Sequence, residues 1–528
     1  MFLIMSGSYV SNDLSAEFGR LPPSFLPLSN KRLFHHQVSL AESCSDTIFL
    51  SMPDDYAIDS IDQSWLKSQN INLIRTPNGL SLGEAIVACF NLMNPSPSTS
   101  LHILFGDTLL SDLPKSKRDI IAISKTKNNY TWASIEDDFA IGDLSNSSGH
   151  SVICGYFHFN RPNQLIRNIT LERWDFIRGV RQYCKEESVE FSETEKWFDF
   201  GHINSYFQSK ANFTTQRSFN ELEITSRFVK KTSSKQSKIK AEANWFKSIP
   251  ESIKIYTPNY LGDGADNNGN FYYKLEYLYN LALGELYVFA DTPNVVWYEI
   301  LNHCFDFIEL CHKNHTSQSI LEQLDDAGGL FRGKTHERLS LYMDDKKFTV
   351  DDQWNFNGKN ISIKQVLADC DPYLPKIGTP TVMHGDLCFS NIIYDFRTNC
   401  IKVIDPRGID NKGNITINGD MNYDISKLAH SIIGLYDYII AGYHATSISW
   451  PERKIVFSMP NTDKHSQLQD FFIKSVWNKF GVQPLSLYAM QIHLFLSMLP
   501  LHDDDQTRQN ALFSNAFRLY TLMKDIES

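Results

Sequence analysis

The chain has 528 residues, of which 42% are hydrophobic and 21% charged, and its formal net charge is −11. One hydrophobic core rarely serves a chain of this length, so two to four domains are expected. The acidic balance argues against a general nucleic-acid binder, which needs a basic surface.

The first five residues are apolar but too few for a signal peptide, and they are better interpreted as a buried strand. We expect no run of about 18 apolar residues of the kind that crosses a bilayer. Nine scattered cysteines without a Cys-x-x-Cys pair are typical of a reducing compartment. A soluble cytoplasmic protein without membrane insertion is therefore predicted.

The first 200 residues or so alternate short apolar segments with helical ones. Such alternation predicts an α/β domain with a mostly parallel sheet and helices on its faces. We place this domain at residues 1–212, and a polar stretch at 208–217 separates it from the next block. The segments predicted to be strands include residues 2–5, 47–51, 73–75, 101–105 and 151–159.

Several segments of this domain follow a recognisable order. Together they resemble the Rossmann-like (GT-A-like) sugar-phosphate nucleotidyltransferases. In that family a glycine-rich loop, a Pro-Lys segment, a nucleotide-contacting loop and two metal-binding segments come in this order. The segments that carry the resemblance are residues 6–8, 19–37, 78–86, 101–109 and 197–206.

The resemblance implies a metal-dependent condensation. Asp107 and Asp199 would hold Mg²⁺, which aligns a sugar phosphate for attack on the α-phosphorus of a nucleotide and releases pyrophosphate. The nucleotide would be CTP or UTP. The residues that would contact it are Ser6, Gly7, Gly79 and Glu84.

This sequence departs from the family in three ways. The glycine-rich loop lacks its Gly-x-Gly-x-Arg form, His202 replaces a threonine, and Ser24 stands where the Pro-Lys lysine would be. That lysine normally neutralises phosphate charge. Three cations of the same segment could substitute for it; otherwise the domain would bind nucleotides without catalysing. They are Arg20, Lys31 and Arg32.

The second block, residues 213–528, predicts a small strand-rich lobe at 213–280 and a helical lobe at 281–528. Apolar residues recur at helical spacing through most of the second lobe. This two-lobed α+β plan is like that of protein kinases. In the small lobe the expected elements are strands at 219–231, 253–256 and 271–278 and a helix at 237–246.

Residues 381–391 and 403–408 predict a catalytic loop and a metal loop. Asp386 and Asn391 lie five apart, and Asp405 follows an apolar strand. A phosphotransferase needs one carboxylate to take the acceptor proton, and an amide and a second carboxylate to hold Mg²⁺ against ATP. The alternative is a loop in which these side chains cap turns. The motifs resemble those of the aminoglycoside phosphotransferase and choline kinase family.

The rest of such a site can be found upstream. Lys231, or alternatively Lys230, would bind the phosphates, and Glu242 would hold that lysine. The alternative is a solvated basic helix face. Ser233 could face phosphate. The hinge for the purine would be Glu276, Tyr277 and Leu278.

Two further residues of the helical lobe are assigned to structure. Asp424 matches the family's supporting aspartate after the metal loop, and His384 is expected to be a structural loop histidine.

These predictions combine into a bifunctional enzyme. The kinase would phosphorylate a sugar or small alcohol, and the first domain would couple the product to a nucleotide for capsule or surface polysaccharide synthesis. The alternatives are a choline- or ethanolamine-type kinase with a cytidylyltransferase, and a kinase with a nucleotide-sugar-binding regulatory domain. The partners are small molecules rather than nucleic acid, and an oligomer is compatible with the sequence.

Overall fold

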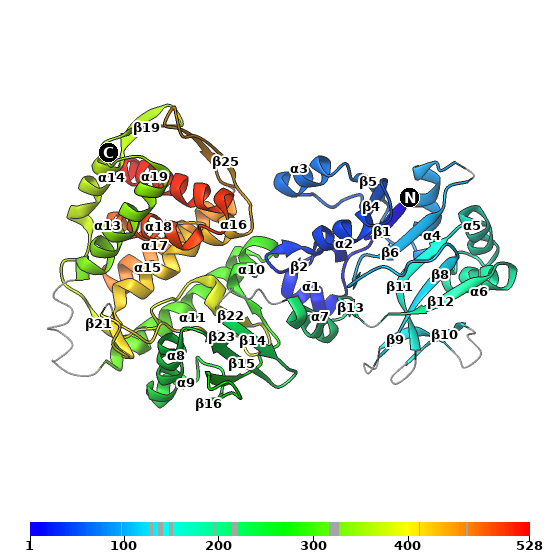
Figure 1. Cartoon of the computed structure of the whole chain (residues 1–528), viewed down its shortest axis with the longest axis horizontal. Helices are drawn as coiled ribbons and strands as arrows, with labels where there is room; N and C mark the ends of the chain where they lie inside the picture. The colour runs from blue at the N-terminus through cyan, green and yellow to red at the C-terminus, as the bar shows by residue number, and fades with distance from the viewer. Residues whose placement is uncertain are drawn as a thin grey trace. The chain divides into compact units, whose positions relative to one another are not determined.

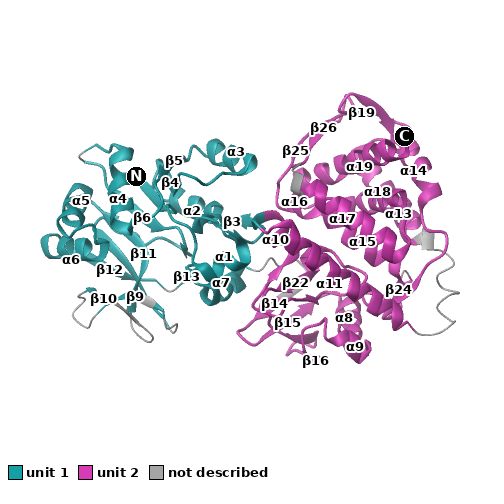
Figure 2. Ribbon diagram, turned by 180° about the vertical axis from the view of Figure 1, so that it is seen from behind, with its two compact units in different colours: residues 1–215, 289–291 teal, residues 216–288, 292–528 magenta. Residues whose placement is uncertain are grey.

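The computed structural model describes residues 1–96, 98–126, 130–135, 141–146, 151–194, 196–213, 220–315, 327–410, 412–460 and 463–528. It contains two compact units (Figure 2), unit 1 with Met1–Thr215 and Phe289–Asp291 and unit 2 with Gln216–Val288 and Thr292–Ser528. The end of the predicted linker, residues 214–217, and the first residue of the predicted strand at 219–231 lie outside the described residues.

Nine strands form the central sheet of unit 1 (Figure 1), in the order β10-β9-β11-β6-β1-β4-β5, with β8 beside β11 and β12 beside β8. The strands of the sheet are β1 (Phe2–Met5), β4 (Ile48–Pro53), β5 (Asn72–Thr76), β6 (Leu101–Phe105), β8 (Asp119–Lys125), β9 (Thr131–Ile135), β10 (Ile141–Asn146), β11 (Ser151–Phe159) and β12 (Val189–Glu193). Two small ribbons accompany it: β2 (Pro27–Leu28) with β3 (Lys31–Arg32), and β7 (Thr108–Leu110) with β13 (Trp197–Asp199).

The prediction of a mostly parallel sheet is confirmed for only part of the sheet. Strands β6, β1, β4 and β5 run parallel, but β11 is antiparallel to β6, β8 and β9. Parallel neighbours need a long crossover, which the helices between β1, β4, β5 and β6 provide. Strands β8 to β11 follow one another without an intervening described helix, and strands joined in that way pair antiparallel.

Helices cover both faces of this sheet. In β1, Phe2 and Ile4 pack on the side of α2 and α3, whereas Leu3 and Met5 pack on the side of α4, α5 and α6. The alternation follows from the two-residue period of a strand, and burial on both sides explains why β1 is apolar throughout. The helices are α1 (Asn12–Phe18), α2 (Leu33–Glu42), α3 (Ser60–Ser68), α4 (Leu82–Met93), α5 (Pro162–Leu171), α6 (Phe176–Glu186) and α7 (Ile203–Lys210).

The small lobe of unit 2 is an antiparallel sheet of β14 (Asn220–Ile224), β15 (Phe228–Ser233), β17 (Phe271–Glu276) and β16 (Tyr260–Ala265), with α8 (Gln236–Ser248) beside it. The predicted strand at 253–256 is wrong, because the short helix α9 (Glu251–Lys254) and a turn occupy it. Pro250 precedes α9 and favours a helix start, and a short apolar run does not distinguish strand from helix.

The second lobe is mainly helical, but it also contains three sheets. Its helices are α10 (Leu283–Phe289), α11 (Asn294–Lys313), α13 (Ala327–Lys346), α14 (Ile363–Cys370), α15 (Met421–Ile432), α16 (Tyr436–Ile440), α17 (Asp463–Phe480), α18 (Pro484–Met498) and α19 (Gln506–Glu527). Its strands are β18 (Leu281–Ala282), β19 (Gln353–Phe356), β20 (Lys359–Ser362), β21 (Pro380–Val382), β22 (Ile392–Asp395), β23 (Cys400–Val403), β24 (Asn418–Asp420), β25 (Ala445–Ser449) and β26 (Lys454–Ser458).

One helical stretch of the described residues, Pro484–His502, is apolar and long enough to span a bilayer by length and composition, with a mean hydropathy of 1.3. The expectation that no such run exists is therefore wrong. However, 67% of the stretch is buried inside the protein, and α18 packs against α13, α15 and α19. Its apolar composition is that of a core helix.

Candidate active sites

The strand lysine of unit 2 lies at the centre of a buried charge cluster. Lys231 on β15 places its Nζ 2.8 Å from Glu242 Oε2 on α8 and 3.0 Å from Asp405 Oδ1 in the metal loop. The side chains of Lys231 and Glu242 are only 6% and 1% exposed. The hydroxyl of Tyr273 on β17 donates to Glu242 Oε2 at 2.8 Å. β15, α8 and the metal loop thus each contribute one charged side chain to a single cluster of ion pairs.

The electrostatics of this cluster keep Lys231 and Asp405 charged. Burial alone would lower the pKa of Lys231, but the carboxylates of Asp405 and Glu242 outweigh it and raise that pKa. Burial would likewise raise the pKa of Asp405, but the ammonium of Lys231 holds it below its ordinary value. The Asp405 side chain is 46% exposed, so its carboxylate is ionised and accessible to a cation.

The other lysine of the predicted pair points elsewhere. Lys230 Nζ is 3.2 Å from Glu223 Oε2 on β14, as the alternation of side chains along a strand requires. The predicted phosphate contact by Ser233 has no support in its surroundings. Its side-chain oxygen accepts from the backbone N–H of Lys235, and its carbonyl accepts from the Gln236 side chain. Ser233 therefore shapes the turn into α8.

The metal loop is held close to the helix that carries Glu242. Asp405 has φ +55°, a left-handed conformation that is rare for residues other than glycine and often marks functional sites. At Gly408, with φ +64°, an added Cβ would lie 2.3 Å from the carbonyl oxygen of Ala241 in α8. Only glycine permits this approach. From the same helix, Trp245 Nε1 donates to the carbonyl of Met383 at 2.8 Å.

The catalytic loop brings Asp386 and Asn391 together. Asn391 Nδ2 donates to Asp386 Oδ2 at 3.0 Å and to the Asp386 carbonyl at 2.9 Å. The nitrogen of this amide faces Asp386, so its oxygen is the atom that could bind a cation. The second oxygen of Asp386, Oδ1, is 3.0 Å from Lys427 Nζ on α15. The geometry orients both oxygens of the carboxylate.

Residues behind the loop support it. Asp424 on α15 accepts hydrogen bonds from the backbone N–H groups of His384 and Gly385 at 2.8 and 2.7 Å. Burial lowers the pKa of His384 to about 4, so its imidazole is neutral, and its Nδ1 accepts from the Asp386 N–H at 3.3 Å.

Sequence reasoning missed Lys427. It lies three residues after Asp424 on the same helix, so helical periodicity places both on the face toward the loop. That spacing was the signal that could have found it. Tyr273, also missed, had no such signal.

Part of the backbone of the predicted purine hinge already makes hydrogen bonds within the small lobe. The backbone N–H of Glu276 donates to the Asn259 carbonyl at 2.9 Å, and that of Tyr277 donates to the Arg227 carbonyl at 3.1 Å. The Glu276 carboxylate also accepts from Asn259 Nδ2 at 2.8 Å. Leu278 lies beyond β17, in the segment that leads to β18.

In unit 1 the ribbon of β7 and β13 joins Asp107 and Asp199. An added Cβ on Gly201 would lie 2.6 Å from Asp107 Oδ2 and 3.3 Å from Asp199 Oδ1, so both carboxylates converge on this glycine. Burial and the charge of Asp199 raise the pKa of Asp107 to about 6. His202 Nδ1 lies 3.5 Å from Asp199 Oδ2, and this contact raises the pKa of His202.

These carboxylates fit Mg²⁺. The ion binds proteins through one or two carboxylates and completes its shell with water and phosphate oxygens. Mutual repulsion of Asp107 and Asp199 is what a divalent cation would relieve. Among the described residues, no group of three or more Cys, His, Asp or Glu side chains is arranged to hold a metal by protein ligands alone.

The position of the absent lysine lies close to this pair. The backbone N–H of Ser24 donates to Ser6 Oγ at 3.0 Å, and Ser24 Oγ donates to the carbonyl of Gly106, next to Asp107, at 3.3 Å. Ser24 and Ser6 are fully buried. At Gly7 an added Cβ would meet Thr76 Oγ1 at 2.5 Å. Ser24 therefore joins the first loop to the Asp107 loop and brings no charge.

The three substitute cations have different environments. Arg32 is buried, with Nε 3.2 Å from Asp62 Oδ2 and Nη1 donating to the carbonyls of Phe25 and Phe289. A phosphate role for Arg32 is wrong, because its charge is already neutralised inside the unit. Arg20 Nη1 is 3.2 Å from Asp55 Oδ2 in a solvent-exposed pair, and Lys31 is exposed on β3.

The predicted nucleotide loop around residue 79 is an ordinary helix start. Glu84 Oε2 accepts from the Ser81 N–H, and Ser81 Oγ accepts from the Glu84 N–H. This capping box engages the Glu84 carboxylate at the beginning of α4. Gly79, with φ +83°, has no atom within 4 Å of an added Cβ, so its surroundings are open.

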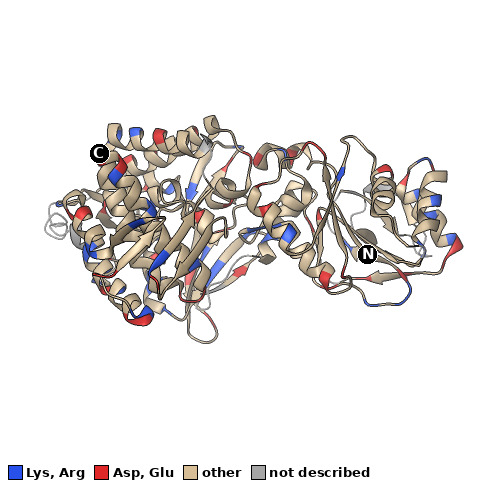
Figure 3. Cartoon of the chain, turned by 90° about the horizontal axis from the view of Figure 1, so that it is seen from above, with Lys and Arg blue, Asp and Glu red and all other residues tan. Residues whose placement is uncertain are grey.

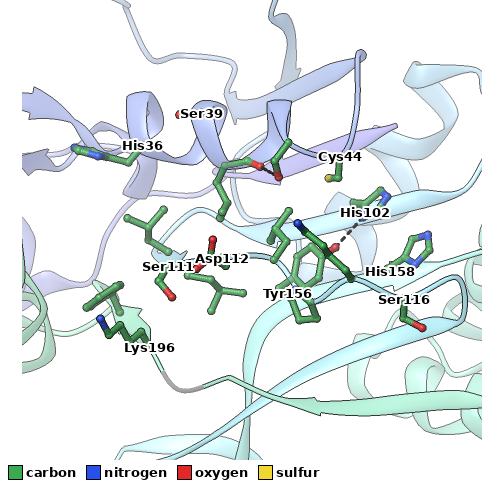
Figure 4. A pocket seen from close by; sticks show the side chains of 18 of the residues that line it. His36, Ser39, Cys44, His102, Ser111, Asp112, Ser116, Tyr156, His158 and Lys196 are labelled. Carbon is green, nitrogen blue, oxygen red and sulfur yellow. Dashed lines mark hydrogen bonds between the residues drawn. The ribbon is translucent and has the colours of Figure 1, made fainter.

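A separate cavity of about 1120 Å³ opens in unit 1 (Figure 4), and none of the described residues that line it is a predicted site residue. Its wall includes His102 on β6, whose Nδ1 is hydrogen-bonded to the Tyr156 hydroxyl on β11.

Figure 3 shows acidic and basic residues interspersed along the chain.

No family model and no curated protein matches the sequence. Solved structures are similar to parts of the chain. A nucleoside-diphosphate-sugar pyrophosphorylase from Vibrio cholerae RC9 is 12% identical and has a TM-score of 0.33, with 40% of this chain and 99% of that chain covered. A glucose-1-phosphate thymidylyltransferase from Bacillus anthracis is 11% identical, with a TM-score of 0.34 and coverage of 41% and 96%.

An aminoglycoside-3'-phosphotransferase of type VIII is 14% identical over 53% of this chain and 94% of that chain, with a TM-score of 0.31. These likenesses concern the two α/β folds alone. The chemistry of each unit rests on the contacts described above.

Proposed function

We propose that unit 2 is an ATP-dependent kinase for a small hydroxylated acceptor. The observation that carries this proposal is the joining of Lys231, Glu242 and Asp405 from three segments, beside a loop in which Asn391 orients Asp386. A loop that merely caps turns would not need a buried lysine with two carboxylates.

Each residue has a role in transfer. Asp386 accepts the proton of the acceptor hydroxyl while the new acceptor O–P bond forms. The bond between the γ-phosphorus and the β,γ-bridging oxygen of ATP breaks, and ADP leaves. Asn391 and Asp405 would hold Mg²⁺, which supplies positive charge at the phosphates when bound. Lys231 would bind phosphate oxygens, and Glu242 would keep it in place.

We further propose that unit 1 couples the phosphorylated product to CTP or UTP. Asp107 and Asp199 would hold the Mg²⁺ that neutralises the triphosphate. Arg20 and Lys31, rather than Arg32, are the cations left to oppose phosphate charge. A second candidate function, binding of a nucleotide-sugar without catalysis, is favoured by the neutral Ser24 at the lysine position.

The products would be nucleotide-activated precursors for surface polysaccharides, made in the cytoplasm where ATP and CTP are present. A choline-type kinase with a cytidylyltransferase is the alternative within the same chemistry. It would require an aromatic and acidic box for a quaternary ammonium group.

The test is to incubate the full chain with ATP, Mg²⁺ and hydroxylated acceptors, with and without CTP, UTP and GTP. ADP and pyrophosphate are measured separately. ADP together with pyrophosphate supports both activities. A second assay supplies sugar phosphates directly. If the first assay gives ADP without pyrophosphate and the second gives no pyrophosphate either, unit 1 binds nucleotides without catalysing. Acceptor-independent ADP release alone would contradict the kinase proposal.

A further inference from the structure

Three cations from separate segments gather around one aromatic ring beside the catalytic loop. Lys334 Nζ on α13 is 5.2 Å from the centre of the Tyr423 ring, Arg407 Cζ in the metal loop is 5.7 Å away, and Lys427 Nζ is 6.0 Å away. Lys427 also contacts Asp386. The cluster of Lys334, Arg407 and Lys427, the acceptor-side cations, therefore adjoins the predicted base.

The charges of this cluster are only partly compensated. Lys427 pairs with Asp386, and Arg407 Nη2 donates to the Asp410 carbonyl at 3.4 Å. Lys334 has no carboxylate within 4 Å among the residues that the structure describes, and its contact is with the Tyr423 ring. Burial and the neighbouring cations Arg407, Arg338 and Lys427 lower the pKa of Lys334 to about 6. Cations collected in a partly buried place repel one another, and a bound anion would relieve that repulsion.

The ATP phosphates have their own cation in Lys231, held by Glu242 and Asp405 on the nucleotide side. The acceptor-side cations are linked instead to Asp386, the group that would face the acceptor hydroxyl. Since α13 supplies Lys334 and α15 supplies Lys427, the helical lobe builds this cluster. The location points to the acceptor rather than to the nucleotide.

We propose that the acceptor carries an anionic group, a carboxylate or a phosphate, that Lys334 and Arg407 bind while its hydroxyl lies against Asp386. This inference rests on the kinase function proposed above and narrows its substrate class. Arginine suits such a site because its planar guanidinium binds carboxylate and phosphate through two parallel hydrogen bonds. A choline-like or polyamine acceptor would be repelled by Arg407 and Lys427, whereas an anion would favour the protonated form of Lys334.

The experiment compares matched acceptors on the full chain with ATP and Mg²⁺. The sets are glycerol, glycerate and glycerol 3-phosphate, then glucose, glucuronate and glucose 6-phosphate, with choline as the cationic member. At least one anionic member should exceed its neutral counterpart by about tenfold or more in kcat/KM, because hydrogen bonds to charged groups discriminate on that scale. The carboxylate and phosphate arms distinguish the two anions.

The variant Lys334→Met should raise KM for the anionic acceptor about 10- to 100-fold, with little change in kcat and little effect on neutral acceptors. Lys334→Arg should restore most of the affinity. Lys346→Met, which removes a lysine from the same helix, α13, is the matched control and should behave like the unsubstituted protein. Equal use of neutral, cationic and anionic acceptors, or a uniform effect of Lys334→Met, would overturn the inference.

A binding measurement separates this inference from the kinase proposal. Calorimetric titration with inorganic phosphate should show one site fewer in Lys334→Met than in the unsubstituted protein and in Lys346→Met. Loss of that site without ADP formation from any acceptor would support the anion site and count against the kinase. ADP formation with identical phosphate binding in all three proteins would leave the kinase standing and overturn the anion site.

Discussion

The two candidate sites manage their negative charge in opposite ways. In unit 1, Asp107 and Asp199 converge on each other, and burial with this repulsion raises the pKa of Asp107 to about 6. In unit 2, Asp405 and Asp386 each contact a lysine, and Lys231 lowers the pKa of Asp405. Unit 1 therefore leaves the repulsion between its two carboxylates only partly compensated, by His202 beside Asp199, whereas each carboxylate of unit 2 has a lysine as its counter-ion.

The largest expected effect separates the two sites by activity. Asp386→Asn removes the base, so kcat for ADP formation should fall by about 10²- to 10⁴-fold. Pyrophosphate release from a supplied sugar phosphate should be unchanged, since that reaction would use Asp107 and Asp199. ADP formation at the original rate would show that Asp386 is not the base.

The second-largest expected effect is on the stability of unit 2 when its counter-ion Lys231 is replaced. Lys231→Met leaves the buried Glu242 with only the more distant Lys238, whose Nζ is 3.7 Å from Glu242 Oε1, and the Tyr273 hydroxyl. The free energy of unfolding of unit 2 should therefore fall by about 2–4 kcal/mol in denaturant titrations. Lys230→Met is the matched control. It breaks the pair with Glu223, whose side chain is 58% exposed, and the contact of Lys230 with the Tyr272 ring. The variant should cost about 1 kcal/mol or less. Equal losses would mean that the cluster is not the stabilising feature.

The pH dependence should have opposite signs in the two units. The pKa of Asp107 is raised from 3.8 to about 6, so its contribution to stability is complete below pH 3.8 and is lost as pH rises through about 6. The loss should be roughly 3 kcal/mol. The pKa of Asp405 is lowered, so its contribution is present above pH 3.8 and is lost as the medium becomes more acidic.

Thermal unfolding from about pH 2 to pH 7, followed separately for each unit, measures both slopes, that of unit 1 above pH 3.8 and that of unit 2 below it. Asp107→Asn or added Mg²⁺ should flatten the slope of unit 1 and leave that of unit 2 unchanged. A slope of unit 1 that persists in Asp107→Asn would assign it to another group.

The smallest effect concerns the support of the lysine cluster. Tyr273→Phe removes the hydrogen bond to Glu242 and should lower the free energy of unfolding of unit 2 by about 1 kcal/mol. Glu242 keeps its contact with Lys231, so KM for ATP should change little. Steady-state kinetics with ATP varied would check this, and a large rise in KM would mean that Tyr273 positions Glu242 rather than only stabilising it.

Sequence analysis predicted the parts of each site that lie within one short motif. Asp107 and Asp405 each follow an apolar strand, so the local sequence pattern predicted that both would lie at the end of a strand. Lys334 and Tyr273 join their sites from elements far along the chain, which no local period predicts. The pairing of β19 with β26, about 100 residues apart, is also beyond local prediction. The hairpins β19–β20 and β25–β26 were missed for another reason, because Asn357-Gly358 between β19 and β20 is a local hairpin signal that was not used.

Local motif reasoning also overreached. The pattern around Glu84, which predicted a nucleotide contact, also forms a capping box. Arg32, one of three cations that could have substituted for the Pro-Lys lysine, is buried beside Asp62. Each side chain has a charge suited to the predicted contact, but its charged group already has hydrogen-bond partners within unit 1. Charge and spacing do not distinguish a ligand contact from an internal one.

The fastening of α8 has a consequence for motion in unit 2. Gly408 packs against its backbone, and Trp245 binds the Met383 carbonyl, so α8 is held by both loops of the helical lobe. Opening of the small lobe to admit a nucleotide would therefore move the sheet of β14 to β17 across a stationary α8. Such a movement would stretch the contacts of α8 with the sheet, which include Lys231 with Glu242 and Tyr273 with Glu242. Because Lys231 joins both carboxylates of the cluster, its pair with Glu242 would report whether the lobe is open or closed.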